Sequence, residues 1–227
     1  MEKRTEQILF ALIKEHIKTG APVGSEILVN KYKLGVSPAT VRNEMANLEN
    51  EGYIIQPHTS AGRIPTERAY EYYLKTIKAK KLSELEIKNF SDILSEKEEA
   101  NFKQAAKALA ETANTAVFWA FHRHNLYYTG IANFLSQPEF SPTMIYDVSA
   151  IIDRMEEIID KVFDEIDFEP QIFLGSKNPF SPICSTIVVR YKLNGHIGMF
   201  GLLGPIRMNY EKNIALITHI KNQLTEK

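Results

Sequence analysis

Three short amphipathic segments followed by two short hydrophobic segments constrain the fold of the N-terminal third. Apolar residues recur at helical spacing over residues 5–19, 25–34 and 38–51, and a glycine follows each segment. After the third segment, residues 53–56 and 64–65 are typical of two strands around a polar tip that contains glycine. Because a tight glycine-containing turn joins the second and third helices, the pattern predicts a helix-turn-helix with a β wing.

Capping residues mark where these helices should begin. Ser25 is expected to cap the second helix, and Ser37 the third, with Pro38 as its first residue. Thr66 should cap a fourth helix that begins directly after the wing. The three helices could also form a packed helical corner with a polar outer face, so the helix pattern alone does not distinguish this structure from a DNA-reading element.

The third helix and the wing carry side chains that suit contact with duplex DNA. Arg42 can donate to guanine, Asn43 can pair with adenine or bind phosphate, and small residues allow close approach to the groove. An arginine beside a glycine in the wing favours contact with the backbone or a narrow minor groove. The predicted DNA-binding residues are Ser25, Ser37, Ala39, Thr40, Arg42, Asn43, Asn47, His58, Thr59, Ser60 and Arg63.

Charge is distributed unevenly along the chain. Residues 1–81 contain 13 Lys and Arg against 9 Asp and Glu, whereas residues 82–227 contain 14 against 19. A basic N-terminal part and an acidic remainder indicate different partners for the two parts. The excess of four positive charges supports nucleic-acid binding only because it accompanies a predicted reading element.

Several runs resemble one family of bacterial regulators. SPATVRNEM, LENEGYIIQPHTSAGRIPT and ERAYEYYL are similar to the N-terminal winged helix of the HrcA heat-inducible transcription repressors, closely over residues 1–75. Residues 128–140 and 174–217 resemble the same family more loosely. The resemblance implies a homodimer that represses chaperone operons at an inverted-repeat operator, the CIRCE element, with help from the chaperonin and without a cofactor.

The rest of the chain predicts an α+β domain. Residues 79–116 are expected to form a helical linker, or helices that pack against a second copy of the chain. Residues 117–227 contain five strand candidates, a long helix over 146–166 and a closing helix over 210–224, with Asn194-Gly195 as a strong hairpin signal. The resemblance implies a GAF-like antiparallel sheet with flanking helices. It is reduced here, because only HRHN separates VFWAF from LYYTG, where the family usually carries an inserted dimerisation domain.

The sequence thus predicts a winged helix over residues 1–78, linker helices over 79–116 and a reduced GAF-like domain over 117–227. Its apolar runs are far shorter than the ~20 residues that span a bilayer, and MEKRTEQ lacks the apolar centre of a signal peptide, so a cytoplasmic protein without membrane contact is expected. Catalytic motifs are missing, Cys184 lies in an apolar context, and His122 and His124 lack a third ligand at metal-binding spacing. The sequence therefore predicts no enzyme and no metal site.

Two other functions remain open at this stage. A winged helix can dock onto protein or RNA, or respond to a ligand, because fold alone does not determine function. The chain could also repress a different set of genes.

Overall fold

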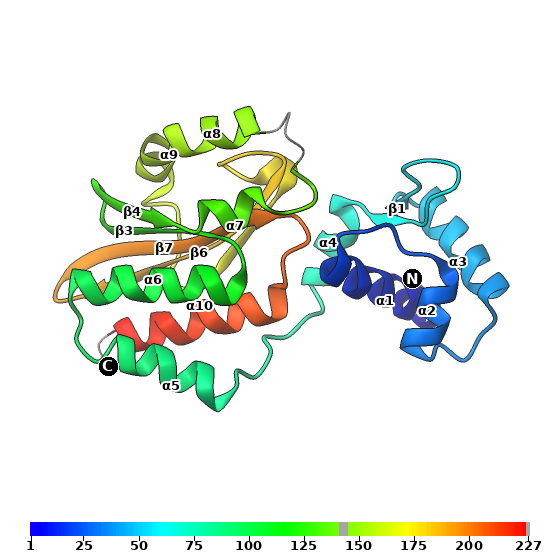
Figure 1. Ribbon diagram of the computed structural model, residues 1–227, viewed down its shortest axis with the longest axis horizontal. Coiled ribbons are helices and arrows are strands. Elements are labelled where there is room, and N and C mark those ends of the chain that lie inside the picture. Colours follow the sequence, from blue (N-terminus) through cyan, green and yellow to red (C-terminus); the bar gives the residue numbers. More distant parts are fainter. Residues whose placement is uncertain (141–144, 226–227) are drawn as a thin grey trace. The chain divides into compact units, whose positions relative to one another are not determined.

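The computed structural model describes residues 1–140 and 145–225, which form two compact units, Met1–Ile77 and Lys78–Lys227 (Figure 1). Along the part of the chain that the structure describes, no helix is both long and apolar enough to cross a membrane.

The first unit is a three-helix cluster with a small hairpin and a fourth helix. Its core is built from the apolar faces of the helices, including Ile8, Leu12, Val41 and Leu48, all fully buried. The antiparallel hairpin pairs Ile54 with Pro65. The elements are α1 (Lys3–Thr19), α2 (Ser25–Tyr32), α3 (Pro38–Asn50), β1 (Ile54–Ile55), β2 (Ile64–Pro65) and α4 (Glu67–Leu74).

Two of the three predicted helix caps are confirmed. The Ser37 side chain accepts a hydrogen bond from the Thr40 backbone N–H, and the Thr66 side chain accepts one from Ala69. The prediction that Ser25 caps α2 is wrong by one residue. Gly24 is the N-cap, because its carbonyl already accepts the hydrogen bond of Leu28 at 3.3 Å, and Ser25 lies inside the first turn with its side chain buried.

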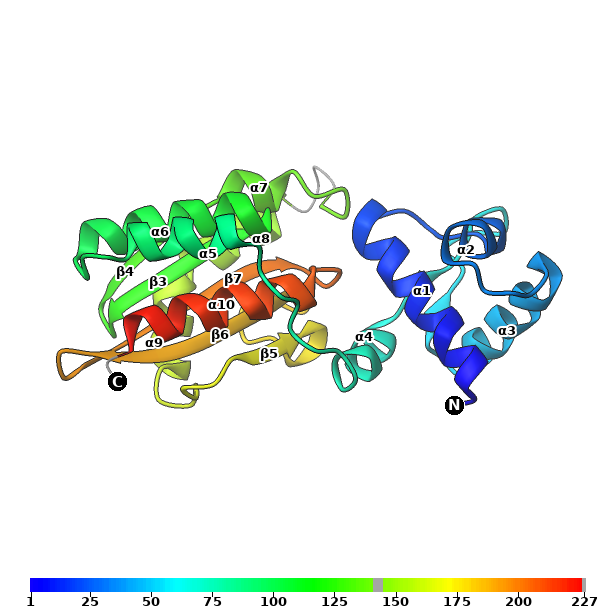
Figure 2. The same ribbon diagram turned by 90° about the horizontal axis from the view of Figure 1, so that it is seen from below.

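The second unit is an antiparallel sheet covered by helices on both faces (Figure 2). The strand order is β4-β3-β7-β6-β5. The strands are β3 (Ala116–His122), β4 (Asn125–Thr129), β5 (Gln171–Leu174), β6 (Cys184–Leu193) and β7 (His196–Pro205). The helices are α5 (Glu84–Ile93), α6 (Glu99–Ala113), α7 (Ile131–Leu135), α8 (Ile145–Asp153), α9 (Met155–Val162) and α10 (Tyr210–Leu224).

The two helical layers bury opposite faces of the sheet. Helices α6 and α10 pack on one face, and α5 packs on them, so the segment expected as a linker contributes helices to this unit. Helices α8 and α9 cover the other face, where Phe118, Val188 and Met199 belong to the same buried cluster as Met155 and Ile159. This arrangement is the predicted α+β class, a sheet with flanking helices after a winged helix-turn-helix.

The hairpin predicted at Asn194-Gly195 is confirmed. Both residues have positive φ, 50° and 77°, which is the backbone that a two-residue turn of type I′ requires. The turn joins β6 to β7, which pair over their whole length from Leu193–His196 to Cys184–Pro205.

The prediction of one continuous helix over residues 146–166 is wrong. The chain forms α8 and α9 instead, separated at Arg154, whose ψ of 3° departs from helical geometry. The buried residues before and after this break both face the sheet, which explains why their spacing resembled a single helix. They are Val148, Ile151, Met155, Ile158 and Ile159.

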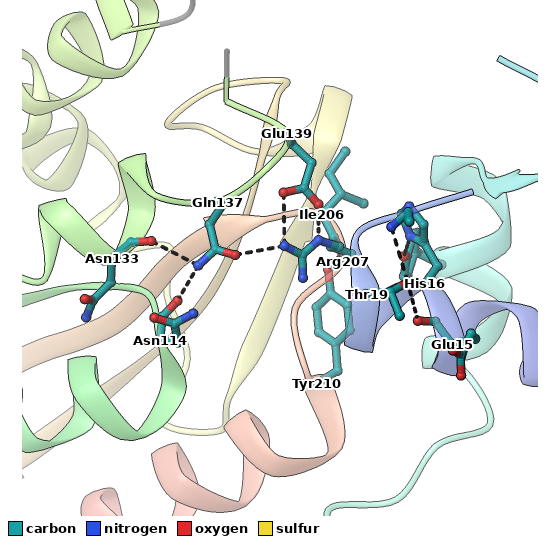
Figure 3. A network of polar contacts seen from close by, with 12 residues as sticks. Glu15, His16, Thr19, Asn114, Asn133, Gln137, Glu139, Ile206, Arg207 and Tyr210 are labelled. Carbon is teal, nitrogen blue, oxygen red and sulfur yellow. Dashed lines mark hydrogen bonds and ion pairs between the residues drawn. The ribbon is translucent and has the colours of Figure 1, made fainter. Parts of the chain in front are cut away.

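A buried glutamine stabilises the connections at one end of the sheet (Figure 3). The side-chain amide of Gln137 donates to the backbone oxygens of Asn114 and Asn133, at 2.9 and 3.0 Å. Its oxygen accepts from Arg207 at 2.9 Å, and Arg207 also pairs with Glu139. The segment after α7 is thereby linked to the turn between β7 and α10.

The single cysteine lies in the core of the second unit. Cys184 is fully buried, and this burial raises the pKa of its thiol to about 12. The thiol therefore stays protonated and unreactive at neutral pH.

Candidate nucleic-acid interface

Helix α3 presents a continuous exposed stripe on the side opposite its core contacts. The stripe repeats at intervals of three and four residues, so its members lie on one face of the helix. It contains one arginine, three asparagines and two alanines, and no acidic residue. Its members are Ala39, Arg42, Asn43, Ala46, Asn47 and Asn50. We call this set the α3 stripe.

The buried face of α3 explains why the stripe points outward. Val41 and Leu48 are fully buried and Met45 is nearly so, and they fix the rotation of the helix. Arg42 has no hydrogen-bond or ion-pair partner among residues 1–140 and 145–225, and its guanidinium is exposed. A free guanidinium in the middle of an uncharged polar stripe is suited to bidentate hydrogen bonding.

The N-terminus of α3 adds a second feature that favours anions. Ser37 satisfies the Thr40 N–H at 3.1 Å and also contacts the Thr40 hydroxyl at 3.0 Å. Pro38 carries no N–H, and the first turn contains no acidic residue. The positive end of the helix is therefore exposed to solvent without a neutralising carboxylate.

The wing is a short hairpin, and hydrogen bonds among its own residues hold the conformation of its tip. The Gln56 side-chain amide donates to the backbone oxygens of Thr59 and Ala61, at 3.0 and 2.9 Å. The Ala61 N–H donates to the His58 oxygen at 2.9 Å, and the His58 ring contacts the Ser60 hydroxyl at 3.2 Å. The side chains of His58, Thr59 and Ser60 are all exposed at this tip.

Glu49 connects the wing to α3. One of its carboxylate oxygens accepts the Gln56 backbone N–H at 3.0 Å, and the other accepts the Arg63 Nε–H at 3.0 Å. The Arg63 side chain is only 21% exposed as a result. Arg63 is predicted to contact DNA, and it also has a role within the protein, because its Nε–H donates to Glu49 and holds the base of the wing.

The wing is also held against the loop before α2. Val23 and Arg63 exchange two backbone hydrogen bonds, of 2.8 and 2.9 Å. The adjacent Gly62 lies so close to this contact that an added Cβ would meet the Val23 carbonyl at 2.5 Å. Glycine is therefore required at position 62 by the close approach of two backbone segments.

The predicted site residues differ in accessibility. Thr40 and Arg63 are half-buried, and Ser25 is only 9% exposed, so its hydroxyl presents little surface to a ligand. The remaining predicted residues are exposed, namely Ser37, Ala39, Arg42, Asn43, Asn47, His58, Thr59 and Ser60.

Sequence reasoning missed four residues of this region. Ala46 and Asn50 continue the spacing of the α3 stripe and could have been found from that spacing. Glu49 and Gln56 carried no local signal, because their roles depend on contacts across the fold.

Two nearly buried carboxylates link the helices beneath this surface. Glu44 on α3 accepts hydrogen bonds from Arg4 at 2.6 Å and Thr5 at 2.9 Å, both at the start of α1. These two hydrogen bonds, that of Arg4 above all, hold the pKa of Glu44 below its usual value. Glu15 on α1 likewise accepts from Lys31 on α2, and this bond lowers the pKa of Glu15.

These carboxylates predict that acid weakens the first unit. A lowered folded-state pKa contributes stability that is present above the unfolded value of 4.5 and is lost as pH falls through the folded-state pKa. Glu44→Gln should therefore cost about 1–3 kcal/mol at pH 7 and progressively less below pH ~4. Thermal unfolding of the full chain from pH 7 to 3 measures this difference. The exposed Glu26→Gln is the control, and a constant gap between Glu44→Gln and the wild type would contradict the prediction.

Comparison with known proteins gives a family and a fold. Residues 40–214 match the family described as HrcA protein C terminal domain. The "Heat-inducible transcription repressor HrcA" of Desulforamulus reducens is 62% identical over 74 residues, which are 33% of this chain and 21% of that protein. The match therefore spans about a fifth of that relative. The protein of the same name from Natranaerobius thermophilus is 27% identical over 328 positions, covering 98% of this chain and 95% of the relative.

A solved structure shows the same fold. A crystal structure of a hypothetical protein superposes with a TM-score of 0.83 at 17% identity, covering 99% of this chain and 98% of the other. At this identity the likeness concerns the fold alone.

The alignment with the Natranaerobius protein also agrees with the absence of an inserted domain from this chain. It extends over 328 positions whereas this chain has 227 residues, so about 100 positions of the Natranaerobius protein have no counterpart here. Only Arg123 and His124 lie between β3 and β4, the place where the sequence predicts that the inserted domain is missing.

Proposed function

The chain belongs to the HrcA family of heat-inducible transcription repressors, and from this premise we propose that residues 1–77 bind duplex DNA in a sequence-specific manner. The α3 stripe enters the major groove, and the wing tip contacts the flanking backbone or minor groove. The second unit carries no part of this DNA-binding surface.

One observation supports this proposal most strongly. The α3 stripe combines an unpaired arginine with three asparagines, contains no acid, and lies on the helix that also holds the wing through Glu49. A solvated helix face on an ordinary domain usually mixes both signs of charge. A stripe of amides with one guanidinium matches the donors and acceptors of base edges instead.

The roles of the individual side chains follow from their chemistry. Arg42 donates two hydrogen bonds to guanine, and Asn43 and Asn47 pair with adenine or accept from cytosine. Ala39 and Ala46 allow the helix backbone to approach the bases. Phosphate contacts come from Ser37, Thr40, His58, Thr59, Ser60 and the Nη groups of Arg63.

We also propose which operator the protein binds and which partner regulates it. The family name supports repression of heat-shock genes, and we propose a CIRCE-type inverted repeat upstream of chaperone operons as the target. An inverted repeat requires two reading heads and hence a homodimer. The chaperonin is the proposed partner that keeps the repressor active, and such a repressor works in the cytoplasm, where the operator lies.

A competition experiment tests DNA binding against the alternatives. The full chain is titrated in a mobility-shift assay with an inverted-repeat operator duplex, a shuffled duplex and an RNA duplex at one salt concentration. We expect a preference for the operator of roughly 10³-fold or more over shuffled DNA. Equal affinity for all three nucleic acids, or none for any, would contradict the proposal.

The variant Glu49→Gln tests whether the ion pair between Glu49 and Arg63 fixes the position of the wing on DNA. The change removes the carboxylate charge that partly neutralises Arg63 but keeps an acceptor for Gln56. The full charge of Arg63 then acts on the phosphate that its Nη groups contact, while the wing loses its fixed position. We expect the slope of log affinity against log salt to steepen by about 0.9 and the preference for operator to fall. Glu51→Gln removes a charge from the same end of α3 without touching the wing. Identical behaviour of both variants would argue against the anchoring role.

A further inference from the structure

The outer edge of β4 is an unpaired strand edge. In the part of the chain that the structure describes, β4 stands at the end of the sheet and pairs with β3 alone (Figure 1). No backbone hydrogen bond reaches β4 from its outer side within the described residues. Natural proteins usually protect such edges with charges, proline or a covering segment, because free N–H and C=O groups recruit another strand.

The strand β4 itself carries neither a charge nor a proline. Its five residues are Asn125, Leu126, Tyr127, Tyr128 and Thr129. The opposite edge strand, β5, is shorter and follows Glu169 and Pro170 directly. The two edges of the sheet are thus unequal, and β4 is the one suited to pairing.

We propose that two copies of this chain associate through antiparallel pairing of their β4 strands. Residues related by a two-fold axis centred on Tyr127 would pair 125 with 129, 126 with 128 and 127 with itself. No other register pairs all five residues. A two-fold axis uses the same surface on both copies and closes after two, so the product is a dimer rather than a fibre.

The side chains of β4 are complementary to themselves in this register. Leu126 and Tyr128 share one face, because side chains alternate along a strand. Tyr128 is 43% exposed, and it would lie opposite the partner's Leu126, forming an aromatic–aliphatic pair twice. On the other face, Tyr127 would meet the partner's Tyr127, and Asn125 would face the partner's Thr129. The strands themselves bring no charges together, and Lys103, which lies 5.8 Å from the ring centre of Tyr127, is paired with Glu99 at 2.6 Å.

The short β3–β4 connection leaves this edge accessible. Arg123 in the turn pairs with Asp160 on α9 and with Asp164 just after this helix, which holds the turn against the helical layer that covers one face of the sheet. A chain that lacks about 100 positions of a relative still has, in β4, a self-complementary surface of its own.

The consequence for DNA rests on the proposed function. A two-fold pair carries two copies of α3 related by the same axis, which is the symmetry that an inverted repeat presents. The association itself is tested without DNA, so its failure leaves DNA binding by the first unit untouched.

Sedimentation velocity of the full chain over a range of concentrations tests the association. The wild type should form a dimer, and Tyr128→Lys should be monomeric, because the lysine would face the partner's Leu126. Tyr146→Lys changes an 88% exposed tyrosine on α8 and should leave the dimer intact. A monomeric wild type, or a Tyr128→Lys variant that dimerises as the wild type does, would overturn the proposal.

A cross-link tests the register. In Tyr127→Cys the two new thiols would lie directly opposite each other across the two-fold axis, so that a small adjustment of the strands brings the Cβ atoms within the separation of about 4.5 Å that a disulfide allows, and mild oxidation should join them into a disulfide-linked dimer. Tyr146→Cys provides the control, and the native Cys184 is fully buried. Efficient cross-linking of Tyr127→Cys alone supports the register. Equal or absent cross-linking in both variants would overturn it.

Discussion

Replacing Arg42 with alanine is expected to weaken operator binding by about 1–3 kcal/mol, roughly 5- to 150-fold, and to relax the preference for one base pair. The guanidinium is exposed at the centre of the α3 stripe and has no internal partner among the described residues, so its loss should not disturb the fold. Titrations of the variant with the operator and with duplexes changed at single positions measure both effects.

Two further variants distinguish base reading from charge. Arg42→Lys keeps the positive charge but loses the planar fork, so it should recover affinity for random duplex without recovering selectivity. Lys75→Ala removes an exposed cation at the end of α4, outside the α3 stripe and the wing, and should change affinity little. If Arg42→Ala and Lys75→Ala behave alike, Arg42 does not read a base.

Gly62→Ala should displace the wing. The new Cβ would lie 2.5 Å from the carbonyl carbon and oxygen of Val23 and 2.8 Å from its nitrogen, distances at which backbone must move. We expect a stability loss of about 1–3 kcal/mol, because the two hydrogen bonds between Val23 and Arg63 are strained or broken. The thermal midpoint of the full chain and its operator affinity should both fall.

Gly24→Ala is the matched control for this prediction. Gly24 is the neighbour of Val23 on the same loop, and a Cβ at position 24 would meet nothing within 4 Å. Its substitution should therefore leave the wing and the operator affinity nearly unchanged. Equal losses in the two variants would show that the close approach at Gly62 does not hold the wing.

Local signals explain how much of the fold could be predicted from the sequence. Ser37 and Thr66 cap helices through contacts three residues away, and Asn194-Gly195 adopts positive φ within a two-residue turn. Such interactions are complete within a few residues, so the sequence alone reveals them. The exposed face of α3 was predictable for the same reason, because helical spacing separates it from Val41, Met45 and Leu48.

The remaining features depend on contacts between distant residues. Glu49 and Arg63 pair although they are 14 positions apart in the sequence, and the residues next to each of them form no pattern that predicts this ion pair. The break at Arg154 involves no proline or glycine, and both halves keep helical spacing toward the sheet. Ser25 had the residue type of a cap, but the packing of α2 placed it one position inside the helix. In each case tertiary structure overrides a local preference.

Amide chemical shifts of the isotope-labelled full chain, recorded during titration with operator duplex, identify the residues that contact DNA. The largest changes should fall on the α3 stripe and on the wing tip from His58 to Ser60, and a shuffled duplex should reproduce them only weakly. Changes confined to residues 78–227, or an α3 stripe that does not respond to operator, would contradict the proposal that this surface binds DNA.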